Sequence, residues 1–191
     1  RTKVHPLLVV RGFQYLLCRL RLVWLPAMVC ISCTPVSISS IQAQILEESI
    51  TFSGGISNNW RDAQNWGVAI PGEFSEVFID SGSVLVTESG IAQQVFVGTG
   101  QSAQLNIRDG NFSVSKDLVV GEFGNVKITG GISQIDSITV NGLRDDLENT
   151  FSGLVNVSGG SLQTNKVVLG EMAGTYGELS VAGGNVNASI V

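Results

Sequence analysis

The side chains that perform most nucleophilic and acid–base chemistry are confined to the first 43 residues of this 191-residue chain. Its only histidine, His5, lies there, and so do its three cysteines, Cys18, Cys30 and Cys33. From residue 44 onward the chain can therefore build neither a Ser-His-Asp triad nor a cysteine nucleophile, and it lacks the ligands of the usual zinc sites. Carboxylates remain as candidate catalytic groups in this part of the chain.

Carboxylates are plentiful beyond residue 43, and paired acids can hydrolyse glycosides when they are held about 5 to 10 Å apart. Glu122 and Glu171 each follow a glycine at equivalent positions of a repeat, and stacking of the repeats would place them roughly 10 Å apart. The other acidic clusters are Glu73 with Glu76 and, further along, Asp145, Asp146 and Glu148. We interpret all of them as a solvated acidic face, so we predict no catalytic residue and no enzyme activity.

Oxygen ligands for calcium could come from Asp145 and Asp146, but the Gly-Gly-x-Gly-x-Asp repeat of calcium-binding β-rolls is missing. No Gly-x-x-x-x-Gly-Lys loop is present either, so phosphate binding is not supported. We predict no metal site and no cofactor, with a weak calcium ion at Asp145 and Asp146 as the open alternative.

Aromatic side chains could stack on sugars. The candidates are Trp60, Trp66, Phe123 and Tyr176. The alternative, which we favour, is that the tryptophans pack in a cap and the other two in loops. Asn-x-Ser triplets begin at Asn111, Asn156 and Asn187, and we assign them no role because they arise by chance in a strand-rich sequence of this composition.

The elements that must position these side chains are repeats punctuated by glycine. Four segments share the pattern apolar, polar, apolar, any residue, small or acidic residue, Gly; they are 105–110, 126–131, 155–160 and 179–184. A second unit, in which two apolar residues flank one position before a glycine, occurs at 95–98, 118–121 and 167–170, and more loosely at 138–142. A third unit follows each glycine pair, at 111–114, 161–164 and 185–188, with a shifted version at 132–135.

Alternation with period two in β-branched residues predicts strands, and nothing here sustains the period of a helix. Three short strands form each repeat, and equivalent residues lie 21 (Leu105 to Val126), 29 (Val126 to Val155) and 24 (Val155 to Leu179) positions apart. This pattern predicts an all-β fold, a right-handed parallel β-helix or three-sided β-solenoid. The alternative is a β-sandwich or meander, in which the recurrence of the three units in one cyclic order would be coincidence.

Stacked turns predict columns of inward-facing side chains. We expect one column of Val97, Val120, Val140 and Leu169, and another of Leu105, Val126, Val155 and Leu179. Strand side chains alternate, so Thr139, beside Val140, is expected to face outward and to tolerate a charge.

The chain is predicted to consist of a signal peptide, an N-terminal cap and a solenoid that carries one insertion. Residues 77–191 are predicted to form the solenoid, which stops in mid-turn and is therefore interpreted as truncated at its C-terminus. Within it, 143–152 is a polar insertion that projects from the coil. Residues 44–76 are predicted to form an N-terminal cap, because the end of a solenoid exposes unpaired strand edges that must be covered.

Residues 1–43 are predicted to be a cleavable signal peptide. Basic residues, the apolar run 22–31 and a small polar stretch follow the order of an export signal, and we place cleavage between Ala43 and Gln44. The alternative is a transmembrane anchor, but a bilayer span requires about 20 apolar residues. After cleavage 6 of the 11 basic residues remain against all 16 acidic ones, a formal charge of −10, which argues against a nucleic-acid partner.

The Trp60-x5-Trp66 pair, the Pro71-Gly72 step and the repeats that end in Ser-Gly-Gly or Ala-Gly-Gly resemble the passenger regions of autotransporter-type proteins and related secreted bacterial β-helix repeat proteins. The resemblance covers roughly 51–191. It implies a solenoid that is secreted or associated with the outer membrane at the bacterial cell surface, and that meets the membrane only through a missing C-terminal region.

We therefore expect a non-catalytic structural stalk or adhesin that contacts extracellular surfaces or polysaccharide. The alternative is a fragment of an extracellular polysaccharide lyase or glycoside hydrolase on the same fold. Such enzymes gather acids and bases in one groove, whereas the six basic residues after residue 43 are scattered along the sequence. A phage tailspike-like protein is a third alternative, which the export signal disfavours.

Overall fold

The computed structural model describes residues 48–67, 69–145, 150–151, 153–171 and 173–189. The predicted signal segment and its cleavage site at Ala43 and Gln44 lie outside the described residues. Within the described ranges the regular elements are strands, apart from the short 3-10 helix Ala63–Asn65 (η1). The prediction of an all-β fold is confirmed.

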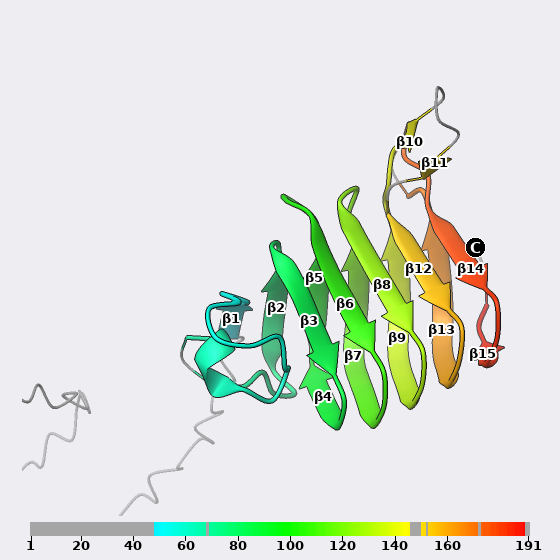
Figure 1. Ribbon diagram of the computed structural model, residues 1–191. Helices are drawn as coiled ribbons and strands as arrows, with labels where there is room; N and C mark the ends of the chain where they lie inside the picture. The colour runs from blue at the N-terminus through cyan, green and yellow to red at the C-terminus, as the bar shows by residue number, and fades with distance from the viewer. Residues whose placement is uncertain (1–47, 68, 146–149, 152, 172, 190–191) are drawn as a thin grey trace, which may run out of the picture. The chain divides into compact units, whose positions relative to one another are not determined.

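The strands form two parallel sheets, between which the chain passes back and forth (Figure 1). Sheet A has eight described strands, in the order Glu48–Thr51 (β1), Ser75–Ile79 (β2), Gln94–Val97 (β5), Asn111–Val120 (β7), Ile132–Val140 (β9), Ser161–Leu169 (β13) and Asn185–Asn187 (β15), with Ser89–Ala92 (β4) also paired to β7. Sheet B has five, in the order Gly82–Val86 (β3), Ala103–Ile107 (β6), Gly124–Ile128 (β8), Leu154–Val157 (β12) and Glu178–Val181 (β14). Because each strand pairs with its equivalent in the next turn, this is the arrangement of a parallel β-solenoid.

In three of the described turns, two of the three predicted units run together as one long strand. In β7 the unit that starts at Asn111 continues into the unit that starts at Leu118, and β9 and β13 are built the same way. The register between β7 and β9 shifts between Val114 and Asp117, a β-bulge in β7. A bulge redirects a strand without ending its pairing. The three expected faces are therefore two sheets, and the long strands of sheet A include one bulge, in β7.

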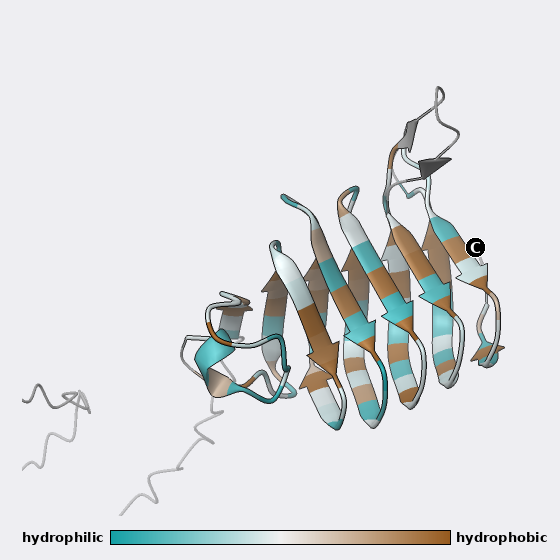
Figure 2. Cartoon of the chain, viewed as in Figure 1, coloured by the Kyte–Doolittle hydropathy of each residue, from teal (hydrophilic) through white to brown (hydrophobic). Residues whose placement is uncertain are grey.

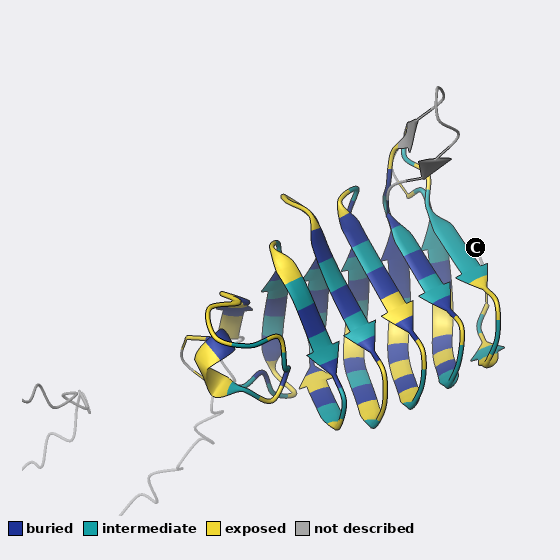
Figure 3. Ribbon diagram, viewed as in Figure 1, coloured by how far each residue is buried: buried dark blue, intermediate teal, exposed yellow. Residues whose placement is uncertain are grey.

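The predicted inward columns are confirmed by the register of the strands. Val120 pairs with Val97 on one side and Val140 on the other, and Val140 pairs with Leu169. In sheet B the second column runs in register through Val84, Leu105, Val126, Val155 and Leu179. Hydrophobic bands continue from strand to strand at the same heights as the buried bands (Figures 2 and 3). The core is thus a stack of aliphatic layers.

Thr139 combines an outward direction with burial. Its side chain lies in the outward row, paired with Val119 and Val168, yet only 8% of its surface is exposed. The same row begins with Phe78 and Phe96, whose rings stack in parallel with centroids 4.7 Å apart. Thr139 therefore faces outward as predicted but is buried by the side chains of its row, which does not favour the expectation that it tolerates a charge.

Glycines occupy a corner at which successive turns touch backbone to backbone. Gly110, Gly131, Gly160 and Gly184 follow the sheet B strands, and their φ values lie between +69° and +80°. A Cβ atom on Gly131 would lie 2.4 Å from the carbonyl oxygen of Gly110 in the preceding turn. Only glycine satisfies both the left-handed backbone and this close approach.

An aromatic cluster closes the N-terminal end of the core. The indole rings of Trp60 and Trp66 are edge-to-face at 5.0 Å, Phe52 packs on Trp66, and Phe112 packs on Trp60. The backbone around Trp60 also bonds to the free edge of β3, since its N–H donates to the carbonyl oxygen of Leu85 at 2.9 Å. Both tryptophans are almost fully buried, and they cover the strand edges of this end.

The opposite end of the described coil is more open. Leu179 and Val186 are only partly buried, whereas their equivalents Val155 and Leu162 in the preceding turn are fully buried. Val181 on β14 is 52% exposed. The last described turn therefore leaves part of its inward row exposed.

The predicted polar insertion contains a short antiparallel pair, Arg144–Asp145 (β10) and Thr150–Phe151 (β11). In Figure 1 this hairpin projects beyond the ends of the sheet strands. In the ranges that the structure describes, no helix has the length and hydrophobicity needed to cross a bilayer.

Candidate binding groove on sheet A

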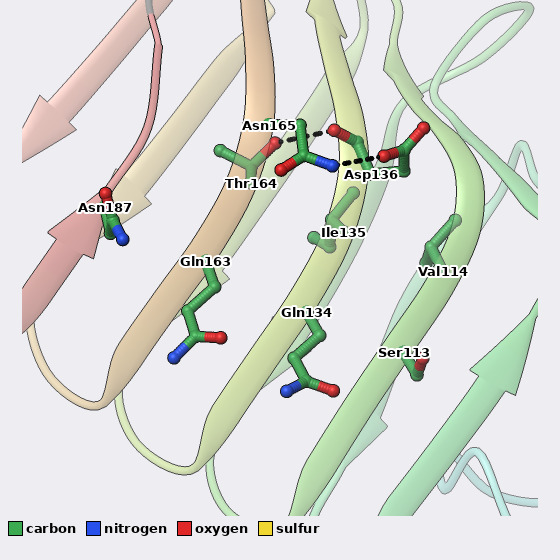
Figure 4. A pocket seen from close by; sticks show the side chains of 9 residues that line it. All are labelled: Ser113, Val114, Gln134, Ile135, Asp136, Gln163, Thr164, Asn165 and Asn187. Atoms are coloured by element: carbon green, nitrogen blue, oxygen red, sulfur yellow. Dashed lines mark hydrogen bonds between the residues drawn. The ribbon is translucent and has the colours of Figure 1, made fainter.

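A polar hollow of about 320 Å³ lies over the outer face of sheet A, where the strands approach their bulge (Figure 4). It crosses β7, β9, β13 and β15, so four successive turns contribute to it. The lining residues are Ser113, Val114, Gln134, Ile135, Asp136, Gln163, Thr164, Asn165 and Asn187. We call this hollow the sheet A groove.

One side of the groove is a row of small polar and amide side chains in exact register. Gln134 pairs with Ser113 on one side and Gln163 on the other, and Gln163 pairs with Asn187. Their neighbours in the strand point inward, so alternation places this row on the outer surface. Parallel strands repeat about every 4.8 Å, so the row presents one polar group per turn.

The other side of the groove lies at the bulge. The side-chain amide of Asn165 donates a 2.6 Å hydrogen bond to one carboxylate oxygen of Asp136. The hydroxyl of Thr164 donates to the carbonyl oxygens of Lys166, at 3.0 Å, and Asp136, at 3.3 Å. The two bonds to Asp136 tie β13 to β9, and the bond from Asn165 holds one oxygen of the Asp136 carboxylate.

The amide groups of the row are not used within the described part of the chain. There, neither Gln134 nor Gln163 makes a side-chain hydrogen bond, and both are exposed. On sheet B the opposite holds, since the amide of Asn106 donates to Ser83 at 2.8 Å and to Gln104 at 3.1 Å. The amide groups of Gln134 and Gln163 on sheet A are therefore open to solvent.

The charge of the groove is negative. Asp136 is the only ionisable side chain among the nine lining residues, and none of them is Lys or Arg. The chain beyond residue 43 is acidic as a whole. The lining itself therefore carries one negative charge and no positive one.

The two glutamates predicted as a possible acidic pair do not share a hollow. Glu122 lines a second hollow of about 200 Å³ together with Val119 and Leu143, and Glu171 is not part of its lining. The backbone N–H of Glu171 donates instead to the side-chain oxygen of Asn141 at 2.9 Å.

The other predicted acidic residues are dispersed. Glu73 is exposed, and Glu76 faces outward from β2. Asp145 belongs to β10, and both Asp146 and Glu148 lie outside the described residues. Within the described ranges no three His, Cys, Asp or Glu side chains gather in a way that could hold a metal ion.

Of the aromatic candidates, Trp60 and Trp66 are buried in the N-terminal cluster and cannot stack on a sugar. Phe123 and Tyr176 are nearly half exposed, in the turns that follow β7 and β13, away from the sheet A groove.

Among the three Asn-x-Ser positions, only Asn187 lines the groove; Asn111 is exposed on β7 and Asn156 faces outward from β12.

Sequence reasoning missed Gln134, Gln163 and the pair of Asp136 with Asn165. The row could have been found by aligning the third unit of each repeat (111–114, 132–135, 161–164 and 185–188) and comparing the polar positions instead of the apolar ones.

Comparisons with protein families, curated proteins and solved structures found no match to this chain.

Proposed function

We propose that the chain is an exported, non-catalytic β-solenoid that acts as a stalk or adhesin, secreted or displayed at the bacterial cell surface. The observation that carries this proposal is the sheet A groove, in which four successive turns present unused polar side chains in register. The coil is taken to be right-handed, the hand that parallel crossover connections adopt almost without exception.

A stacked coil suits a stalk because its length grows with the number of turns. Each turn adds about 4.8 Å along the axis, and each contacts only its neighbours. The aliphatic columns and the backbone pairing hold the turns in register without the help of disulfides, which the chain beyond residue 43 cannot form. The outer faces are then free to make extended contacts.

A non-catalytic role is supported by the chemistry of the groove. Glycoside hydrolysis by acids requires two carboxyl groups that flank the bond to be cleaved. The groove contains one carboxylate, that of Asp136.

The alternative, an extracellular polysaccharide lyase or glycoside hydrolase, rests on Glu122 and Glu171. Each lies two residues after the end of a paired strand, at Val120 and Leu169, and those strands are separated by β9 alone. If this pair were catalytic, substitution of both residues by Gln would abolish the release of sugar products. We expect no such release from the unsubstituted chain.

Export is tested by producing the chain, preceded by an initiating Met, in a Gram-negative host and sequencing the N-terminus of the protein in each cell fraction. We expect a mature form that begins at Gln44 and is found outside the cytoplasm. The variant Ala43→Arg should accumulate uncleaved, because the residue before the cleavage point must be small. Full-length chain confined to the cytoplasm would refute the proposal.

A further inference from the structure

We infer that the sheet A groove binds an uncharged, hydroxyl-rich glycan that lies along the axis of the coil, across the strands. This inference rests on the proposed function and specifies its ligand class. It is drawn from the direction of the groove, the hydrogen-bonding capacity of its lining and its charge.

The direction of the groove selects an extended ligand that crosses the strands. Four strands about 4.8 Å apart span roughly 14 Å, so one ligand molecule can meet all four turns at once. A peptide would bind by adding a strand to a free sheet edge. The groove offers no such edge over β7, β9 and β13, because each is paired on both sides.

The lining matches hydroxyl groups. A side-chain amide offers both donors and an acceptor, and a sugar hydroxyl does the same. Gln134 and Gln163 keep this capacity unused, and the serine and asparagine that flank them extend the row.

Asp136 adds a stronger acceptor. One of its carboxylate oxygens receives the bond from Asn165, which leaves acceptor sites for a ligand hydroxyl on the other oxygen. A hydroxyl that donates to a carboxylate makes a charge-assisted hydrogen bond, stronger than one to a neutral group. Asn165, held by this bond, is a positioning residue for the carboxylate.

The same carboxylate excludes acidic polymers. An acidic glycan or a nucleic acid would bring negative charges against Asp136 with no Lys or Arg in the lining to compensate. An uncharged glycan avoids this repulsion.

Binding should depend on the length of the ligand. Neutral hydrogen bonds on an exposed face are individually weak. A polymer that meets several turns gains effective concentration for each later contact. Affinity should therefore rise from short oligosaccharides to the polymer of the same sugar.

The inference is tested by affinity electrophoresis of the 191-residue chain in gels that contain dextran, xylan or mannan, with alginate and polygalacturonate as acidic probes. We expect at least one neutral polymer to retard the chain. The double variant Gln134→Ala/Gln163→Ala should weaken that retardation about tenfold or more. The matched control is Gln64→Ala/Gln101→Ala, which removes two exposed glutamines elsewhere and should leave retardation unchanged.

The possible outcomes are distinct. Circular dichroism and thermal unfolding establish that both double variants are folded. Retardation by the acidic polymers alone, by no polymer, or equally in both double variants would overturn the glycan assignment of the groove. None of these results would affect the export experiment, so the proposed function and its ligand fail separately.

Discussion

The substitution Gly131→Ala tests whether the turns touch backbone to backbone. Gly131 has a φ of +69°, and a Cβ atom there would lie 2.4 Å from the carbonyl oxygen of Gly110. The left-handed backbone alone costs alanine about 1 to 2 kcal/mol, partly offset by about 0.4 to 1 kcal/mol from a less flexible unfolded chain. Displacement of the neighbouring turn adds about 1 to 3 kcal/mol, the usual cost of overpacking.

The matched control is Gly174→Ala. Gly174 also has a left-handed backbone, with a φ of +83°, but no atom lies within 4 Å of its added Cβ. Both variants carry the backbone cost and only Gly131→Ala carries the overlap, so the difference between them isolates the contact between turns. We expect Gly131→Ala to be less stable than Gly174→Ala by about 1 to 3 kcal/mol.

The assay is guanidinium unfolding followed by circular dichroism. The slope of the unfolding free energy against denaturant concentration should be the same for both variants, so that a difference in midpoint reports a difference in stability. Equal losses of unfolding free energy would refute the close contact between turns at this corner. A larger loss in Gly174→Ala would do the same.

Three further predictions concern the core, the N-terminal cluster and the hairpin. The hydroxyl of Ser133 is buried without a hydrogen-bond partner among the described residues, so Ser133→Ala should raise the unfolding free energy by about 1 kcal/mol, and a loss would contradict this. Trp60→Ala should lower the unfolding free energy by about 3 to 5 kcal/mol, because the ring is 1% exposed and packs on two aromatic rings; a change below about 1 kcal/mol would show that the cluster does not close the core. Replacement of residues 144–151 by two glycines should change the unfolding free energy by less than about 1 kcal/mol, since a shorter loop costs little to close; a loss above about 2 kcal/mol would mean that the hairpin packs into the body.

The repeat, its period and its inward columns could be predicted from the sequence because they depend on alternation and on glycine spacing. Val120, Val140 and Leu169 lie at the same place in successive units, and parallel stacking follows from that periodicity. The union of two units into one strand could not be predicted. Ser115 and Lys116 resemble a polar turn in the sequence, whereas in the structure they form a bulge that keeps the pairing.

The solvent exposure of a strand side chain was harder to predict than the face of the sheet toward which it points. Alternation correctly placed Thr139 on the outward face, but whether an outward side chain is buried depends on its neighbours in the row, here two valines from other turns. The groove was missed for a related reason. Gln134 and Gln163 are 29 residues apart, and only the strand register brings them side by side.

If this coil binds a glycan through its outer groove without cleaving it, the protein should be retained by a polymer that keeps its length. Both quantities can be measured in the same samples by incubating the chain with dextran, xylan and mannan, determining the protein retained, and determining the polymer length by size-exclusion chromatography. We expect at least one neutral polymer to retain the protein and to keep its length. Shortened polymer would contradict the non-catalytic function, and the absence of retention by every neutral polymer would contradict the assignment of the groove.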